Sequence, residues 1–387
     1  MLKSQLTTDQ KRQQSEAFGY FSTSKKYTSA KGEKTVNKTR KIPAREGLNF
    51  PWKRAPEVGK PMEVAQQIYW LRLPLPMKLN HVNVYLADEG DSWTIIDTGV
   101  DSQPTREIWR LLQDQFFNEK PIARVIATHH HPDHIGLAGW FQREYDCDLM
   151  TTRTAWLFAR MLTLDEQETL TPENTEFYRR SGMPSAQLRR RVSERPFNFV
   201  DIVAPLPLGY TRIKEGDCIK MAGRNWDVRI GNGHAPEHLI FWSKDDNLVI
   251  AGDQVLSSIS PIIGVYATEP MANPLLDWLE TCKCFEALAD DNQLVLAGHK
   301  LPFRGLRKRM AELLRHHQDA LDRTMDFLNQ PRSAVDCFSP LFERQIGESE
   351  YNLALSEAVA HLNYLFLSEQ LSRELSPRGV WLYQRKD

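Results

Sequence analysis

The sequence contains no apolar run approaching the ~20 residues that a membrane-spanning helix needs, which predicts a protein without a membrane partner. Cysteine is scarce too: five residues, scattered and odd in number, argue against a disulfide framework and predict a reducing compartment, the cytoplasm. The net charge is only −1, so no overall field favours nucleic acid or a membrane surface. The 41% of apolar residues suffices for a sizeable core.

Residues 1–62 differ from the rest of the chain. Up to Glu46 they hold eleven Lys and Arg against four acids, and Ser, Thr and Gln are frequent. No apolar segment of a secretory signal is present. This composition predicts a disordered basic arm, followed by a proline-containing linker over residues 48–61. A transit peptide and an arm that binds nucleic acid are the alternatives.

Apolar periodicity predicts one folded domain over residues 63–305, beginning β-β-β-α-β-α with mixed sheet character. The expected strands are Ile68–Leu73, His81–Ala87, Ser92–Asp97, Arg124–Thr128, Tyr210–Ile213, Cys218–Met221, Trp226–Gly231, Leu239–Trp242, Leu248–Ala251 and Leu294–Ala297, and the first helices are Pro104–Phe117 and Gly136–Tyr145.

Residues 154–205 interrupt this pattern as a helical insertion that is rich in arginine. The arginines concerned are Arg179, Arg180, Arg189, Arg190 and Arg191. Two interpretations are open: a solvated helix face, or a lid whose cations meet an anionic substrate.

The most informative stretch is V-I-A-T-H-H-H-P-D-H-I-G, in which an apolar strand opens into a loop with four of the chain's 11 histidines. Imidazole and carboxylate are ligands of zinc, iron and manganese. In an extended segment residues i and i+2 point the same way, so His129 and His131 can hold one ion. Asp133 and His134 follow across the turn at Pro132 and can face a second ion.

Three later strands also end at glycine and then present a metal-binding side chain. They lead to His234 in G-N-G-H, Asp253 in A-G-D and His299 in A-G-H. Repetition of this placement predicts that these side chains converge at one edge of a sheet.

The motif T-H-H-H-P-D-H resembles the H-x-H-x-D-H signature of the metallo-β-lactamase-fold hydrolases, in the glyoxalase II-like group. I-D-T-G with Asp97 and the three later ligand positions fit as well, so the resemblance covers roughly residues 64–303. It implies an α+β fold, a four-layer αβ/βα sandwich. Two positions depart from the family pattern: G-H-T-P-G-H is here G-H-A-P-E-H, and G-H-G is here Gly298-His299-Lys300.

The resemblance also implies a site for two divalent metal ions, most simply Zn²⁺, with Fe or Mn as alternatives. One ion would lie on His129, His131 and His234, the other on Asp133, His134 and His299, and Asp253 would bridge them. A hydroxide between two metals would be the nucleophile, and Asp133 would orient it. Asp97 would support a ligand or the loop backbone. His238 would either do the same or contact the substrate.

The bond that is cleaved does not follow from the fold. A thioester, ester or lactone of a small substrate, linked to CoA or glutathione, is favoured because of the arginine-rich insertion. A phosphodiesterase or nuclease acting on RNA or DNA is the alternative, suggested by the basic arm and by a winged-helix-like segment at residues 333–387. A metal-containing protein that binds a small ligand with little turnover is the alternative of another class. The oligomeric state is open, and a dimer is one option.

After His299 a helical stripe over residues 306–332 predicts a connecting helix. Residues 333–387 then predict a helix, Asn352–Glu369, followed by the strands Leu371–Leu375 and Val380–Gln384. Helix and hairpin together resemble a winged-helix domain, which follows the hydrolase domain in some family members. Because Ser356–Glu369 carries no Lys or Arg, we expect a packing or pocket-lining role rather than DNA binding.

Overall fold

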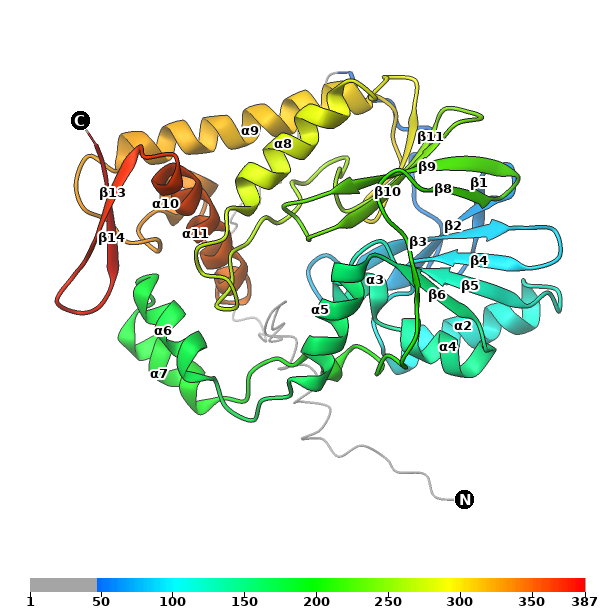
Figure 1. Ribbon diagram of the computed structural model, residues 1–387, viewed down its shortest axis with the longest axis horizontal. Coiled ribbons are helices and arrows are strands. Elements are labelled where there is room, and N and C mark those ends of the chain that lie inside the picture. The colour runs from blue at the N-terminus through cyan, green and yellow to red at the C-terminus, as the bar shows by residue number, and fades with distance from the viewer. Residues whose placement is uncertain (1–46, 387) are drawn as a thin grey trace, which may run out of the picture.

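Two β-sheets form the centre of the molecule, and helices cover their outer faces (Figure 1). The computed structural model describes residues 47–386, so the predicted basic arm of residues 1–46 lies outside the described part of the chain. The first sheet has the order β1-β2-β3-β4-β5-β6-β7, antiparallel from β1 to β4 and parallel from β4 to β7. Its strands are Met62–Ala65, Ile68–Pro74, His81–Asp88, Trp93–Ile96, Ile122–Ile126, Asp148–Thr151 and Thr211–Arg212.

The second sheet has the order β12-β11-β10-β9-β8 and is antiparallel except between β11 and β12. Its strands are Cys218–Met221 (β8), Arg224–Gly231 (β9), His238–Ser243 (β10), Leu248–Gly252 (β11) and Leu294–Ala297 (β12). Both sheets therefore contain a parallel pair of strands, β4 with β5 and β11 with β12, whose carboxyl ends carry candidate site residues.

Side-chain alternation explains how the sheets stack. On β10, Leu239 and Phe241 belong to the core between the sheets, whereas Ile240 and Trp242 pack against the outer helices. On β3, Tyr85 faces the other sheet and its neighbours face the opposite way. Each strand buried on both faces must be apolar throughout, and this makes the strands readable in the sequence.

Helices complete the four layers. The first sheet carries α2 (Gln103–Gln115) and α4 (Ala138–Tyr145), and the second carries α8 (Pro274–Glu286) and α9 (Leu306–Phe327). The predicted αβ/βα sandwich is thereby confirmed. Strands β1 and β6, of four residues each, were not predicted. No helix among residues 47–386 is both long and apolar enough to cross a membrane.

The insertion contains α5 (Arg153–Leu164), α6 (Pro172–Arg180), α7 (Ser185–Ser193) and η2 (Phe199–Asp201). Helices α6 and α7 of the insertion lie next to the C-terminal segment at one end of the molecule, whereas α5 lies beside the first sheet (Figure 1). The C-terminal segment contains α10 (Phe338–Phe342), η3 (Glu348–Glu350), α11 (Tyr351–Leu367), β13 (Leu371–Leu375) and β14 (Trp381–Arg385). The predicted helix and hairpin are present, and the winged-helix assignment stays a prediction.

Most arginines of the insertion have acidic partners. Arg179 and Arg180 both bind Glu176, and Arg190 binds Glu348. Arg179 also donates to the Arg378 carbonyl at 3.0 Å, in the turn of the hairpin. These arginines hold the insertion against the C-terminal segment, so their charges are largely compensated within the chain.

Candidate metal centre

The ends of five strands meet at one rim of the sandwich and bring every predicted metal ligand together. Their donor atoms form three overlapping groups that could hold a metal ion, within 4.8 Å of one another: His129, His131 and His234; His129, His134 and Asp253; Asp133, His134 and His299. We call the first the three-histidine group and the last the mixed group.

The three-histidine group is built from the loop after β5 and from the end of β9. The ring centroids of His129 and His131 are 4.6 Å apart, and that of His234 lies 5.1 Å and 4.5 Å from them. His234 Nδ1 donates to the Ile262 carbonyl at 2.8 Å, which turns its Nε2 toward the other two rings.

The mixed group joins the same loop to the end of β12. His299 Nε2 lies 3.2 Å from Asp133 Oδ2, and its Nδ1 donates to the His81 carbonyl at 2.8 Å. His134 Nε2 lies 3.7 Å from Asp133 Oδ2. Asp253 stands between the groups, because its Oδ2 is 3.1 Å from His299 Nε2, 3.5 Å from His134 Nε2 and 3.7 Å from His234 Nε2.

Asp97 fixes two ligands at once. Its carboxylate accepts from His134 Nδ1 at 2.8 Å and from the backbone N–H and hydroxyl of Thr128 at 2.7 and 2.9 Å. Since the Thr128 hydroxyl donates to Asp97, it accepts from His129 Nδ1, 3.0 Å away. Both imidazoles therefore carry their proton on Nδ1 and present Nε2. The sequence reading had not singled out Thr128, although a hydroxyl directly before His129 was visible.

Two glycines of the A-G-D and A-G-H motifs are required by close approach. Gly252 has φ 47°, and a Cβ there would lie 2.5 Å from the His238 ring. A Cβ on Gly298 would overlap Asp253 Oδ1. His238 itself stacks on His129 with 4.5 Å between centroids and accepts from the Asp253 N–H at 3.1 Å, so it supports both groups from behind.

Four buried polar atoms of the centre lack a hydrogen-bond partner among residues 47–386. His129 Nε2, His134 Nε2, His234 Nε2 and Asp253 Oδ1 are buried, and no hydrogen bond reaches them. Buried polar atoms are normally satisfied. Divalent cations among these atoms would satisfy them, so the residues present fit a metal centre.

Comparison with known families agrees with this geometry. The model of the family described as "Metallo-beta-lactamase superfamily" matches residues 77–316, more than half of the chain. The chain belongs to the metallo-beta-lactamase superfamily. A second model, "Metallo-beta-lactamase-like, C-terminal domain", matches residues 321–386, which confirms an additional C-terminal domain in this superfamily member.

Similar proteins of the superfamily span nearly the same length. A "Probable metallo-hydrolase YqjP" of Bacillus subtilis (strain 168) is 27% identical over 321 residues, 79% of this chain and 94% of that protein. A crystal structure of a beta-lactamase domain protein from Burkholderia ambifaria has 36% identity and a TM-score of 0.81, and the match covers 88% of this chain and 98% of the other. A metallo-beta-lactamase family protein from Thermus thermophilus has 25% identity and a TM-score of 0.69, over 84% of this chain and 100% of the other. This chain is thus a metallo-hydrolase with a His/Asp cluster that could hold metal.

Charges differ between the two groups of this metallo-beta-lactamase centre. Burial and the neighbouring imidazoles hold the pKa of His129 and His131 well below the usual value, so both are neutral donors. Burial also lowers the pKa of His299, but the Asp253 and Asp133 carboxylates outweigh it and raise that pKa to about 9. The negative charge of the mixed group therefore favours a bound cation. Without metal, that cation is the proton on His299.

An irregular loop, residues 254–265, lies between the metal centre and helices α9 and α11 and contacts both helices. Arg309 of α9 is 2% exposed and donates to the Leu256 carbonyl at 2.6 Å and the Ile259 carbonyl at 2.8 Å. The Val265 N–H donates to the Ser356 carbonyl of α11 at 3.0 Å. Helices α9 and α11 thus hold the loop whose Ile262 orients His234, and no sequence motif pointed to this.

Other residues considered from the sequence lie around the centre. His130 packs against Phe158 and Phe199 of the insertion, with centroids 5.1 and 6.4 Å away, so it turns away from the ligands. Asn83 Nδ2 donates to the carbonyls of Ala297 and Lys300, at 2.9 and 2.8 Å, which fixes the backbone around His299.

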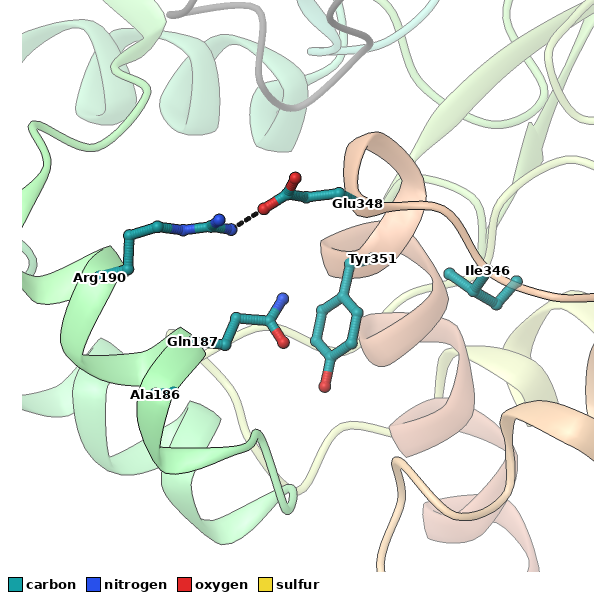
Figure 2. Close-up of a pocket in the computed structure, with 6 residues that line it drawn as sticks. All are labelled: Ala186, Gln187, Arg190, Ile346, Glu348 and Tyr351. Atoms are coloured by element: carbon teal, nitrogen blue, oxygen red, sulfur yellow. Dashed lines mark ion pairs between the residues drawn. The ribbon is translucent and has the colours of Figure 1, made fainter.

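A pocket of about 390 Å³ lies between α7 and the start of α11 (Figure 2). Its lining is Ala186, Gln187, Arg190, Ile346, Glu348 and Tyr351, and it includes no candidate ligand. The Arg190–Glu348 ion pair crosses it, as Figure 2 shows. This pocket joins the insertion to the C-terminal domain and is not the metal centre.

Proposed function

We propose that this chain hydrolyses an ester, thioester or lactone bond with two divalent metal ions. The three-histidine group would hold one ion, the mixed group the other, and Asp253 would touch both. The observation that carries the proposal is the set of buried, unpartnered nitrogen and oxygen atoms at the centre. Imidazole and carboxylate donors without thiolate favour Zn²⁺, with Fe and Mn as alternatives.

Bound divalent metal supplies a Lewis acid and lowers the pKa of a water that it binds, so no serine or cysteine nucleophile is required. Asp133 is the carboxylate best placed to act on that water, because its side chain is 18% exposed whereas that of Asp253 is 8% exposed. Its Oδ2 faces His299, and we expect its Oδ1 to orient the water and accept its proton. Asp97 keeps His134 in the tautomer that leaves Nε2 free.

The choice of bond rests on what surrounds the centre. We favour a small substrate over nucleic acid, because much of α11 is buried and Ser356–Glu369 carries no Lys or Arg. A phosphodiesterase and a ligand-binding protein with weak turnover are the competing functions. A cytoplasmic setting remains a prediction, and it agrees with five cysteines that are all free thiols.

A substrate panel tests this proposal. Acyl-CoA, a glutathione thioester, homoserine lactone and bis-nitrophenyl phosphate are offered to metal-loaded protein, with Asp133→Asn as the control. We expect turnover of one of the first three, loss of it in the variant, and about two metal ions per chain by elemental analysis. Turnover of the phosphodiester alone would favour the nuclease, and turnover of none would favour the ligand-binding protein.

A further inference from the structure

Two cations lie beside His299 at the rim of the sandwich. Arg72 of β2 points between the sheets, because Leu71 and Leu73 face the outer helices whereas Trp70 faces the other sheet. Lys300 directly follows His299 at the end of β12. His81 connects them: the Lys300 N–H donates to its Nε2 at 3.0 Å, and Arg72 Nη2 lies 2.7 Å from its Nδ1.

The Arg72 guanidinium is poorly satisfied by the chain. An imidazole offers at most one acceptor nitrogen. Arg72 Nη2 and the Lys300 N–H face the two nitrogens of one ring, so His81 accepts a hydrogen bond from only one of them. Arg72 Nε is buried and has no hydrogen-bond partner, and the remaining contact, with Asn80 Oδ1, is long at 3.3 Å.

Neither cation has an acidic partner in the part of the chain that the structure describes. Within residues 47–386 no carboxylate forms an ion pair with Arg72 or Lys300, and both side chains are partly buried. Arginines of the insertion, in contrast, bind Glu176 and Glu348. Partly buried cations without a counter-charge are costly to maintain, which makes them candidates for binding an anion.

The backbone of Lys300 adds an independent observation. Its φ is 68°, in the left-handed region that residues other than glycine rarely adopt. The family pattern has glycine at this position. The chain therefore carries a cation next to a proposed ligand in a conformation that lysine does not favour, and such strain is typical of functional positions.

We infer that Arg72 and Lys300 form an anion-binding subsite that takes a carboxylate or phosphate group of the substrate next to its scissile bond. The guanidinium offers paired donors to an oxyanion, and the ammonium adds a point charge. The inference rests on the proposed function and narrows it to esters or thioesters that carry a second, anionic group. From the sequence, the arginines of the insertion were the expected contacts of an anionic substrate. The inference places that contact at Arg72 and Lys300 instead.

Matched substrates test the subsite. The succinyl and butyryl thioesters of N-acetylcysteamine differ by one carboxylate on the acyl side, and acetyl phosphopantetheine and acetyl pantetheine differ by one phosphate on the thiol side. We expect wild type to prefer the anionic member of one pair in kcat/KM. That preference should fall at least tenfold in Lys300→Met and Arg72→Gln. Lys78→Met is the control, because Lys78 already pairs with Glu350 at 2.9 Å, and its preference should equal that of wild type.

A binding experiment separates this inference from the proposed function. The melting temperature of metal-loaded protein is measured in succinate and in butyrate. Succinate should give the larger increase in wild type and Lys300→Arg, but not in Lys300→Gly, whose glycine suits the backbone. If Lys300→Gly loses the succinate effect but the wild type turns over no thioester or ester, the proposed function is contradicted and the subsite is supported. Unchanged preference in Lys300→Met and Arg72→Gln, or a succinate effect retained in Lys300→Gly, would overturn the subsite.

Discussion

The two halves of the metal centre are built in different ways. The loop from His129 to His134 follows one strand, and Asp97, 37 residues before His134, holds it by direct hydrogen bonds. The later half takes His234, Asp253 and His299 from three strand ends. It depends on the irregular loop 254–265, which is held by helices that extend to Ser356. The first half is a local structure, whereas the second is completed only by the C-terminal region.

The largest effect should come from losing one ligand in each metal group, His131 in the three-histidine group and His299 in the mixed group. We expect His131→Ala and His299→Ala each to reduce the metal content by about one ion per chain and turnover by about 10²–10⁴-fold. Elemental analysis of dialysed protein measures the first quantity and initial rates the second. Loss of both ions in either variant would show that the two groups do not bind metal separately.

Asp97→Asn should affect both metal groups, because Asp97 holds His134 of the mixed group directly and His129 of the three-histidine group through Thr128. We expect metal affinity to fall by roughly 10–100-fold, the usual cost of removing a partner that orients a ligand. Thr128→Val is the matched comparison and should weaken only the ion on the three-histidine group. Chelator competition measures both affinities, and equal losses in the two variants would contradict the bonding order described.

Arg309→Gln should lower the metal affinity of the three-histidine group by about tenfold, at the lower end of such effects because it acts on His234 through the loop. Arg323 is its control: on the same helix, its Nε and Nη2 donate to the Pro340 and Leu341 carbonyls at 2.8 and 3.4 Å. Arg323→Gln should lower stability without changing the absorption spectrum of the Co²⁺-loaded protein, whereas Arg309→Gln should change it. Identical spectra would mean that the loop does not need Arg309.

The smallest signal should be proton release on metal binding. With its pKa at about 9, His299 is protonated at pH 7 in the metal-free chain and must lose that proton to bind metal. Affinity of the mixed group should therefore rise between pH 7 and pH 9, while that of the neutral three-histidine group stays flat. Calorimetry in buffers of different ionisation enthalpy measures the number of protons released on metal binding, and we expect about one or more per chain. Metal binding without proton release would contradict the charge difference.

The same contrast explains what the sequence could predict. The strands were readable because two-sided burial requires continuous apolar runs, and His129 to His134 were readable because one loop holds them. Arg309, Ile262 and the pairing of Arg190 with Glu348 were not readable, since each acts across a contact between distant segments. Thr128 lay between these cases: it is local, but its role depends on Asp97 reaching across from the neighbouring strand.

The second half of the metal centre depends on contacts made as late in the chain as Ser356, and this has a consequence for biosynthesis. His134 leaves the ribosome 222 residues before Ser356, and at about 5–20 residues per second this interval lasts roughly 10–45 s. During it the four histidines of the first loop are present without the helices that finish the centre. A nascent chain could therefore acquire a metal ion in an incomplete site, and the order of metal loading in the cell would then follow the order of translation.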